Sequence, residues 1–457
     1  MNIFRYIANI YGDLRGYHRS QIRAEARRNL CRTPDSLKES SDRLFQRRVR
    51  DALTRFPLYA DKVRAHCGGL PKCGDVIRPA ELPVWTRDDQ RCLFSALTAP
   101  PVPGAFVHAT GGSTGEPTRF YVTRESYEWR MAMADRGYSW AEAEEGRRSV
   151  YVWGSPIKPL SWRAKIRADL SHRLQRRRYF DSFVFDDRCK EACCRAINRF
   201  KPHALVGYAG NLVELARFVQ DHPGLLAWKS RTAVTAAEGL LPGQRELIES
   251  TLTDELFMSY GSREFSLIGM ECKEHCGYHL SADNLLVEVV DEAGNPAAPG
   301  NIGRILVTDL RNDANPFIRY EIGDWGIGSD QPCGCGLPFP MLAAVNGRIQ
   351  EFLHAADGTK VTALFVPHMM KEFGWVRGYQ LVQAKPGSVA VRVIADGVVM
   401  ATMTDPVAEL LRGKLGSGTV VAFEQVAELK KSPSGKTPIV VSFVDNTTQV
   451  IRNQNSA

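Results

Sequence analysis

Ala109-Thr110-Gly111-Gly112-Ser113-Thr114-Gly115-Glu116-Pro117 combines three glycines, three hydroxyl side chains and a closing proline within nine residues. Glycine allows close approach of the backbone, and backbone N–H groups with Ser/Thr hydroxyls can surround phosphate oxygens. Strand-like segments at 105–107 and 120–123 flank the loop, which predicts strand–loop–strand. A P-loop would need a following helix and a lysine, and this loop has no lysine. We interpret it as a phosphate-binding loop; the alternative is a glycine-rich hairpin without a ligand.

The size and composition of the chain predict a soluble protein with more than one domain. It has 457 residues, 44% of them hydrophobic and 24% charged, which is too long for one ordinary core. The N-terminus has no apolar run of signal-peptide length, and no stretch of about twenty apolar residues predicts a transmembrane span. Eleven cysteines in a chain of this length favour a reducing compartment, and we expect the cytoplasm.

The net charge of +8 is partly concentrated in arginine-rich segments. Seven arginines lie between Arg5 and Arg32, and a second run, Arg173 with Arg176–Arg178, follows Trp162 and Lys165. Such segments can contact an anionic membrane surface, although solvated helix faces are the alternative. No zinc-finger spacing or RNP-like motif indicates nucleic-acid binding. The sequence leaves the oligomeric state open.

The order of apolar segments predicts an α/β fold. The first hundred residues have a helical pattern, with Asp35-Ser36 and Ser40-Ser41-Asp42 as expected caps between helices. After the loop, short strands alternate with amphipathic helices, which indicates a partly parallel sheet. The expected strands are 149–153, 204–207 and 232–236, and the expected helices are 211–220 and 243–252; a smaller β-subdomain is expected from strands at 285–290, 303–308 and 317–320.

The pattern changes again near Asn346-Gly347-Arg348. The segments that follow suggest a compact α+β unit of about 110 residues, a size typical of a small domain. We therefore predict two domains, a large N-terminal one over residues 1–346 and a smaller, mobile C-terminal one over residues 347–457.

Three short segments after the loop carry groups suited to nucleotide chemistry. Ser259–Glu264 combines an aromatic ring, a glycine and a carboxylate that could hold Mg²⁺. Arg319–Asp324 ends in a carboxylate that could accept hydrogen bonds from ribose hydroxyls. Lys436 lies in the loop Ser432–Pro438. Each is weak evidence alone, because a strand end, a turn and a surface lysine would look the same.

Taken in this order, the motifs resemble the adenylate-forming superfamily of acyl-CoA ligases. The loop is similar to that family's T-G-G-S-T-G-x-P signature, Tyr260–Glu264 to Y-G-x-x-E, Tyr320–Asp324 to Y-x-x-G-D, and Gly347-Arg348 to its hinge. The closer resemblance is to the phenylacetate–CoA ligase branch and its CapK-like members from capsular polysaccharide gene clusters. The ending Ser434-Gly435-Lys436 is also similar to that subgroup. The resemblance spans about residues 80 to 440, and these five motifs in the right order make it specific.

The resemblance implies a large adenylate-forming domain and a role for each motif residue. It implies that Lys436 from the small domain, Glu264 and Arg348 are catalytic, with Glu264 binding Mg²⁺. The ATP-binding residues that it implies are Thr110, Gly111, Gly112, Ser113, Thr114, Gly115, Ala237, Glu238, Ser259, Tyr260, Asp324 and Arg348. Gln350 stands where the family commonly has a hinge aspartate.

The implied reaction is ATP-dependent, AMP-forming activation of a carboxylic acid, with transfer of the acyl group to CoA. A carboxylate and an α-phosphate are both anions, so Mg²⁺ and one mobile lysine supply the positive charge. Tyr and Trp residues near Trp153 and Tyr208 make an aryl acid one candidate. The acyl acceptor could instead be an amine, a carrier-protein thiol or a sugar. A degenerate nucleotide-binding scaffold is the alternative from another class.

Two clusters of soft ligands predict a structural zinc site. Cys272, His275, Cys276 and His279 precede Cys333 and Cys335, and such paired clusters are typical of closed tetrahedral zinc. Buried free cysteines with surface histidines are the alternative. Four ligands must be chosen from six candidates, and the family resemblance favours Cys272, His279, Cys333 and Cys335, with Cys276 or His275 as substitutes.

Overall fold

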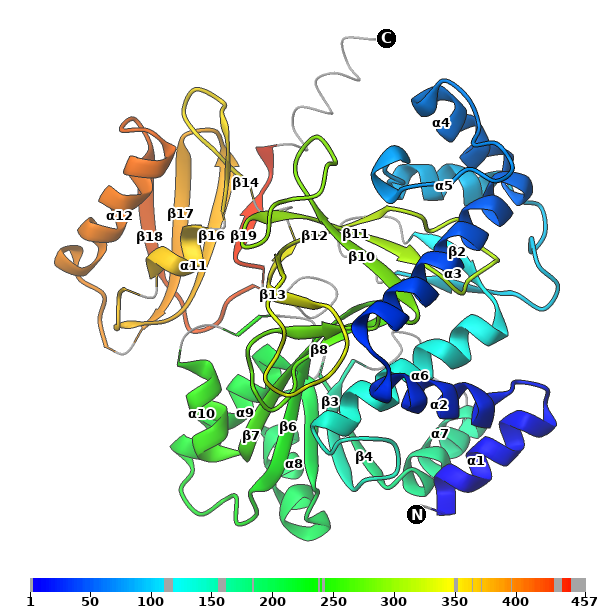
Figure 1. The fold of residues 1–457 in the computed structure, drawn as a ribbon. Coiled ribbons are helices and arrows are strands. Elements are labelled where there is room, and N and C mark those ends of the chain that lie inside the picture. The colour runs from blue at the N-terminus through cyan, green and yellow to red at the C-terminus, as the bar shows by residue number, and fades with distance from the viewer. Residues whose placement is uncertain are drawn as a thin grey trace. The chain divides into compact units, whose positions relative to one another are not determined.

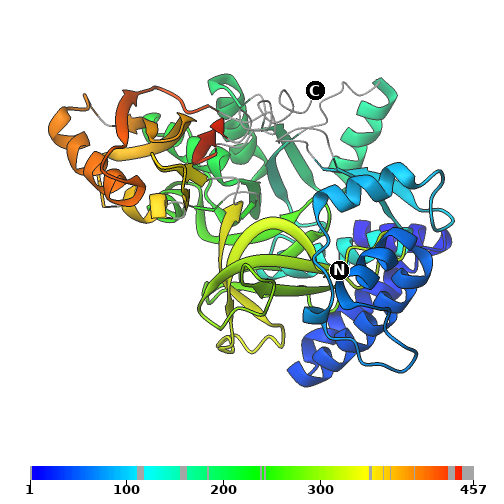
Figure 2. The same cartoon turned by 90° about the horizontal axis from the view of Figure 1, so that it is seen from above.

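The structure, a computed structural model, describes residues 3–110, 118–154, 162–182, 185–236, 239–240, 243–348, 352–363, 365–370, 372–395, 397–430 and 438–444. It divides into two compact units. The first holds the described residues up to Gly347 except Gly243, and the second holds Gly243 with the described residues of Arg348–Ala457. The division into a large domain and a mobile small one stays a prediction, and each unit is described by itself (Figures 1 and 2).

An eleven-stranded sheet forms the framework of the first unit, in the order β10-β11-β12-β13-β9-β8-β7-β6-β5-β3-β4. Its parallel half runs from β4 to β7. The antiparallel half begins where β8 pairs with β7. The strands of the parallel half are β3 (Ser149–Trp153), β4 (Arg177–Asp181), β5 (Ala204–Tyr208), β6 (Ser230–Ala236) and β7 (Thr253–Ser262).

Helices cover both faces of the parallel half of the sheet. Apolar side chains point alternately to its two faces, so both faces must be covered. Leu205 of β5 packs with α8 (Asp187–Phe200), α9 (Ala209–Asp221) and α10 (Gln244–Thr251) in one buried cluster. The next residue, Val206, packs in another cluster, against the end of α6 (Arg124–Trp140) and residues just beyond it. Successive strand side chains point to opposite faces, so the near-continuous apolar strands are buried on both sides. The predicted α/β fold is confirmed.

The antiparallel half forms the β-subdomain with the N-terminal helices. Its strands are β8 (Ser266–Met270), β9 (Tyr278–Leu280), β10 (Leu285–Val290), β11 (Ile302–Asp309), β12 (Tyr320–Ser329) and β13 (Met341–Arg348). The helices before the loop are α1 (Ile3–Leu14), α2 (Arg19–Arg28), α3 (Pro34–Arg55), α4 (Pro57–Cys67) and α5 (Arg87–Ala96), with short 3-10 turns at Asn29–Cys31 and Pro79–Glu81. Phe45 and Val49 of α3 pack in one core with Val307 of β11.

The expected helix caps at 35–36 and 40–42 are wrong. Helix α3 runs without a break through both positions, and its N-cap is Thr33, whose side chain accepts a hydrogen bond from the Ser36 N–H. Ser41 is buried and donates its hydroxyl proton to the Ala282 carbonyl at 2.5 Å. A serine that looks like a cap in the sequence therefore serves as a packing contact between α3 and the β-subdomain.

The strand expected at 317–320 begins only at its last residue, Tyr320. Arg319 has φ = 49°, a left-handed backbone conformation that a strand does not allow. Its buried guanidinium donates to the carbonyls of Leu82 and Gly294, both at 2.6 Å, and lies 3.2 Å from the Glu288 carboxylate. These contacts hold the turn that delivers Tyr320 into β12.

The second unit is an α+β unit with its own core. Its four-stranded sheet has the order β18-β17-β16-β19, and β14 pairs with β15. The elements are β14 (Phe352–His354), β15 (Lys360–Thr362), α11 (Phe365–Met370), β16 (Val376–Lys385), β17 (Ser388–Ala395), α12 (Ala401–Leu415), β18 (Val420–Gln425) and β19 (Val440–Ser442). Leu381, Val391 and Leu411 lie in this core.

None of the helices in the described part of the chain has both the length and the apolarity needed to span a bilayer.

Candidate functional site

The phosphate-loop motif is held at its base by a two-stranded hairpin. Strand β1 (Phe106–Ala109) pairs with β2 (Arg119–Val122) in antiparallel register. The Thr110 N–H donates to the Thr118 carbonyl at 3.0 Å, and the Thr118 N–H donates to the Thr110 hydroxyl at 2.9 Å. The first hydroxyl of the motif therefore closes the hairpin, and the predicted strand–loop–strand order is present.

Two motifs that lie 60 residues apart in sequence meet through a tyrosine and an aspartate. The Tyr260 hydroxyl, at the end of β7, donates to Asp324 Oδ2 of β12 at 2.9 Å. Gly323, just before the aspartate, has φ = 87°, which favours glycine. A Cβ at Gly261 would lie 2.2 Å from the Ser266 carbonyl oxygen, so the glycine of the first motif is needed for close packing of β8.

A second contact joins the same motifs, with the tyrosine now from the second motif and the acid from the first. The Tyr320 hydroxyl, from the second motif, donates to Glu264 Oε1 of the first at 3.4 Å. Both side chains are buried, Glu264 at 1% exposure. Burial, together with the Glu264 charge, raises the pKa of Tyr320, so the phenol stays protonated and can donate. A buried carboxylate is costly unless it is paired, and a cation such as Mg²⁺ would compensate its charge.

Sequence reasoning missed Arg87, the first residue of α5. Its guanidinium hydrogen-bonds the Tyr320 side chain and donates to the Ile322 carbonyl at 3.4 Å. It therefore lies beside both the Tyr320–Glu264 pair and the turn before Asp324. Its motif-free position, more than 200 residues before β12, gave no signal in the sequence.

Ser259 belongs to β7, and its side chain contacts both the neighbouring parallel strand β6 and helix α6. Its hydroxyl donates to the Thr235 carbonyl of β6 at 2.9 Å and is hydrogen-bonded to Tyr138. Burial raises the pKa of the Tyr138 phenol. Nearby along the carboxyl ends of the parallel strands, the Trp153 and Tyr208 rings lie 4.6 Å apart. In open α/β sheets, ligands bind outside these strand ends.

Several predicted site residues lie outside the described residues. They are Gly111, Gly112, Ser113, Thr114, Gly115, Ala237, Glu238 and Lys436. Arg348 ends β13, and its side chain also lies outside the description. The roles expected for these residues stay predictions.

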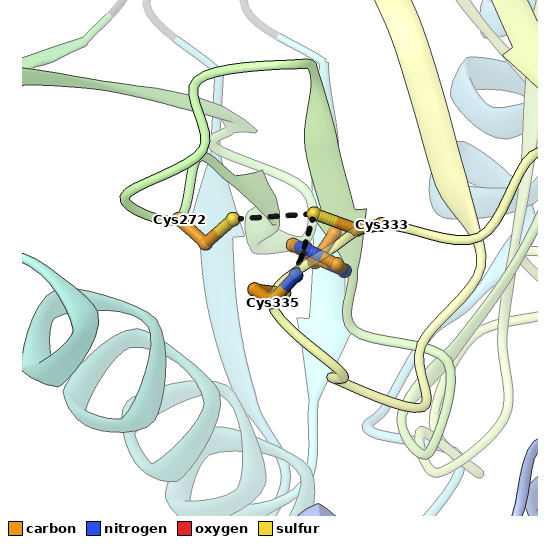
Figure 3. Close-up of side chains that lie close together, drawn as sticks. Cys272, Cys333 and Cys335 are labelled. Carbon is orange, nitrogen blue, oxygen red and sulfur yellow. Dashed lines mark hydrogen bonds between the residues drawn. The ribbon is translucent and has the colours of Figure 1, made fainter.

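The four predicted zinc ligands come together in the first unit. One ligand atom from each of Cys272, His279, Cys333 and Cys335 lies within 4.8 Å of the others. Figure 3 shows the three cysteines pointing toward one another. Cys272 Sγ lies 3.6 Å from Cys333 Sγ, and Cys335 Sγ lies 3.3 Å from His279 Nε2. Cys272 follows β8, His279 belongs to β9, and the other two lie between β12 and β13.

The donor set fits a zinc ion. Burial raises the pKa of the Cys272 thiol to about 12 and lowers the pKa of His279, which favours the neutral imidazole that binds metals. Burial also acts to raise the pKa of Cys333, but hydrogen bonds from Cys335 and the neighbouring thiols outweigh it and lower that pKa. Buried thiols are costly to ionise unless a cation is present, and Zn²⁺ deprotonates its thiol ligands.

The two substitute ligands differ in their surroundings. The exposed Cys276 places its Sγ 3.4 Å from Cys333 Sγ, so it lies next to the four-residue cluster. His275 contacts carboxylates instead, with Nδ1 3.1 Å from Glu271 and Nε2 3.2 Å from Glu255. Its pKa is raised, first by the Glu271 hydrogen bond. His275 is therefore engaged as an ion-pair partner.

Comparisons with known proteins agree with the motifs. Residues 353–443 match the model of the CapK C-terminal domain. A phenylacetate-coenzyme A ligase from Thermus thermophilus is 26% identical over 269 residues, which cover 57% of this chain. The aligned region spans 58% of that ligase's length, less than two thirds of it.

Solved structures show the same fold. A crystal structure of 2-hydroxyisobutyryl-CoA ligase in the postadenylation state, in complex with 2-HIB-AMP, has a TM-score of 0.69 at 18% identity and covers 93% of this chain and 92% of its own. The amide bond synthetase McbA from Marinactinospora thermotolerans has a TM-score of 0.53 at 17% identity, covering 76% of this chain and 71% of its own. The resemblance to the adenylate-forming superfamily, and to its phenylacetate–CoA ligase and CapK-like branch, is thereby confirmed: the chain has the fold of these ligases and carries a CapK C-terminal domain.

Proposed function

We propose that this protein is an ATP-dependent, AMP-forming carboxylate ligase that makes an acyl adenylate and transfers the acyl group to CoA. The observation that carries the proposal is the pair of crossed contacts, Tyr260 to Asp324 and Tyr320 to Glu264. Each tyrosine holds the carboxylate of the other motif. The two acids that we expect to contact the ribose and the metal are thus each held by one tyrosine.

The first half-reaction joins a carboxylate oxygen to the α-phosphorus of ATP and releases pyrophosphate. Asp324 can accept hydrogen bonds from ribose hydroxyls as well as from Tyr260, since a carboxylate has about four lone-pair sites. Glu264 would hold Mg²⁺, which neutralises phosphate charge. Lys436 would stabilise charge between the acid and the α-phosphate. The loop 110–115 would hold the β- and γ-phosphates, and Arg348 would assist at the ribose.

The proposed acyl substrate is an aryl or medium-sized apolar acid. Trp153 and Tyr208, 4.6 Å apart at adjacent strand ends, offer aromatic surface where such an acid would bind. CoA is the acceptor that we favour because the Thermus thermophilus relative is a coenzyme A ligase. An amine is the second candidate acceptor, because the amide bond synthetase shares the fold.

The proposed zinc ion is structural. Four protein ligands would complete a tetrahedral site and leave no open position for chemistry. Zinc would tie the segment after β8 to the segment between β12 and β13, and so stabilise the part of the sheet that carries Tyr260 and Asp324. Reduced thiols are needed for this, which fits our placement of the protein in the cytoplasm.

A pyrophosphate-release screen tests the proposal. The full chain is incubated with ATP, Mg²⁺ and a panel of aryl, aliphatic and amino acids, first without an acceptor and then with CoA or an amine. We expect at least one acid to stimulate release and one acceptor to accelerate turnover. If no acid stimulates release by protein that binds ATP, the ligase proposal is wrong and a nucleotide-binding scaffold is favoured.

A further inference from the structure

Helix α7 (Trp162–Leu174) exposes its large apolar side chains instead of burying them. Trp162, Ile166, Leu170 and Leu174 are 68%, 58%, 55% and 52% exposed. Their spacing of four residues places them along one stripe of the helix. The opposite side packs on the sheet through a polar residue, since the His172 ring stacks on Tyr179 of β4 at 5.2 Å. This is the reverse of a helix that covers a core.

The segment that contains this stripe is strongly basic. Residues 162–178 include seven arginines and lysines and one acidic residue, Asp169. Arg173, Arg176 and Arg178 are exposed at the end of α7 and just beyond it. Large apolar side chains next to clustered arginines are typical of helices that lie in the interface of an anionic bilayer. A soluble protein partner would supply apolar surface but would need a matching acidic surface as well.

Helix α1 has the same reversed arrangement. Its exposed large apolar side chains, between 41% and 82% exposed, are Tyr6, Ile7, Ile10, Tyr11 and Leu14. Its inner side contacts α2 through a buried glycine, Gly12, and through Asn9, which accepts a hydrogen bond from Arg23 at 3.0 Å. Figure 1 draws α1 and α7 toward the same side of the first unit. Exposed apolar patches of this kind mark interaction surfaces.

We propose that α7, together with α1, docks the protein on the surface of an anionic phospholipid bilayer. The apolar stripe would enter the boundary between headgroups and acyl chains, and the arginines would contact lipid phosphates. The inference goes beyond the ligase activity and does not depend on it.

Vesicle co-sedimentation of the full chain tests this proposal. The probes are vesicles of phosphatidylglycerol and phosphatidylcholine in equal parts, and vesicles of phosphatidylcholine alone. At low salt we expect binding to the anionic vesicles that is stronger than to the neutral ones by about ten-fold or more. Because the Debye length shrinks to about 3 Å at 1 M salt, high salt should weaken the electrostatic part of this binding.

Two variants separate the apolar from the basic contribution. Ile166→Glu with Leu170→Glu should reduce binding by about ten-fold or more, since both charges would enter the apolar boundary. Arg173→Gln with Arg176→Gln should reduce binding and also flatten its salt dependence. The matched control is Val398→Glu with Leu410→Glu, which places two acids at exposed apolar positions of the second unit and should leave binding unchanged. Unchanged circular-dichroism melting shows that each variant is folded.

Three results would overturn the proposal. The folded chain binds neither vesicle, or it binds neutral vesicles equally well, or the variant at 166 and 170 binds like the unsubstituted chain. Sedimentation-equilibrium runs without lipid check the competing occupant, a second copy. A dimer that dissociates on substitution of Ile166 and Leu170, with no vesicle binding, would assign the stripe to a protein interface.

Discussion

The Tyr260 hydroxyl donates to Asp324 at 2.9 Å, and so connects the end of β7 to β12. These strands are separated in the sheet by β13, β9 and β8. The contact is mirrored by Tyr320 and Glu264. Replacing the tyrosine of either motif should therefore disturb the position of the carboxylate of the other motif. The four residues thus form a unit that can be tested by kinetics.

We predict that Tyr260→Phe lowers kcat/KM for ATP by about ten-fold, since a hydrogen bond to a charged carboxylate contributes about 1.5–3 kcal/mol. Asp324→Ala should cost more, about ten- to a hundred-fold, because it removes a charged acceptor. Steady-state pyrophosphate release measures both. Tyr11→Phe, at an exposed tyrosine of α1, is the control. Equal kinetics for Tyr260→Phe and the control would contradict a role for this hydroxyl at the nucleotide.

Glu264→Gln should raise the Mg²⁺ concentration needed for half-maximal activity. The amide keeps the shape and can still accept from Tyr320, but it lacks the charge that a hard cation prefers. A Mg²⁺ titration of pyrophosphate release at saturating ATP measures the shift. Glu274→Gln, on a turn outside the crossed contacts, provides the comparison. An unchanged titration curve would rule out Glu264 as a metal ligand.

Lys436→Ala should reduce kcat for adenylate formation by about 10²- to 10³-fold and leave ATP binding nearly unchanged. The lysine would act on charge that develops in the transition state, so it contributes little to ground-state affinity. Single-turnover kinetics and equilibrium ATP binding separate the two effects. Lys430→Ala, at a nearby exposed lysine, should behave like the unsubstituted chain. Wild-type turnover of Lys436→Ala would identify a surface lysine without a catalytic role.

The purified chain should contain about one zinc ion, measured by inductively coupled plasma mass spectrometry. Cys335→Ser should remove the ion and lower Tm by at least about 5 °C, because zinc binding contributes folding free energy. Cys276→Ser should keep the zinc. Loss of zinc from Cys276→Ser but not from Cys335→Ser would instead make Cys276 the fourth ligand.

The ion pair between Arg136 and Asp283 should make the fold sensitive to acid. Asp283 is buried, and although burial acts to raise its pKa, Arg136 and Asn29 lower it below the ordinary value. An aspartate with a depressed pKa stabilises the fold above its unfolded pKa of about 3.9, and this stabilisation is lost as the pH falls through its folded value.

Denaturant unfolding at several pH values checks the ion pair. Asp283→Ala leaves Arg136 buried without its partner and should lower the free energy of unfolding by about 3–5 kcal/mol at pH 7. The difference from the unsubstituted chain should narrow below about pH 4. A difference that stays constant down to pH 2 would assign the loss to packing alone.

The sequence predicted the features that depend on local pattern. The strands β5, β6 and β10 follow from short apolar runs, and β1 and β2 follow from the glycine-rich loop between them. The Phe317–Tyr320 strand and the caps near Ser41 failed because tertiary contacts override local preference. Arg319 is held in a left-handed turn by distant carbonyls, and Ser41 bonds Ala282.

In the candidate site, too, local sequence pattern predicted some features, while others depend on tertiary contacts. Motif order predicted Tyr260, Glu264 and Asp324 one by one as site residues, but their crossed contacts depend on how strands that are not neighbours approach each other. Arg87 could not be predicted as a site residue, because no sequence motif surrounds it. For zinc, spacing alone left six candidates open, and the structure places Cys276 as close to Cys333 as the favoured ligands are.

The central claim is that a carboxylate oxygen attacks the α-phosphorus of ATP, and an isotope experiment tests it most directly. An acid that supports pyrophosphate release is labelled with ¹⁸O in both carboxylate oxygens and incubated with the protein, ATP and the acceptor. The mass of the AMP that forms is then measured by mass spectrometry. We predict AMP that carries one ¹⁸O atom, since the bridging oxygen stays on phosphorus when the acyl group leaves. Unlabelled AMP, or label found only in pyrophosphate or phosphate, would contradict an acyl-adenylate intermediate.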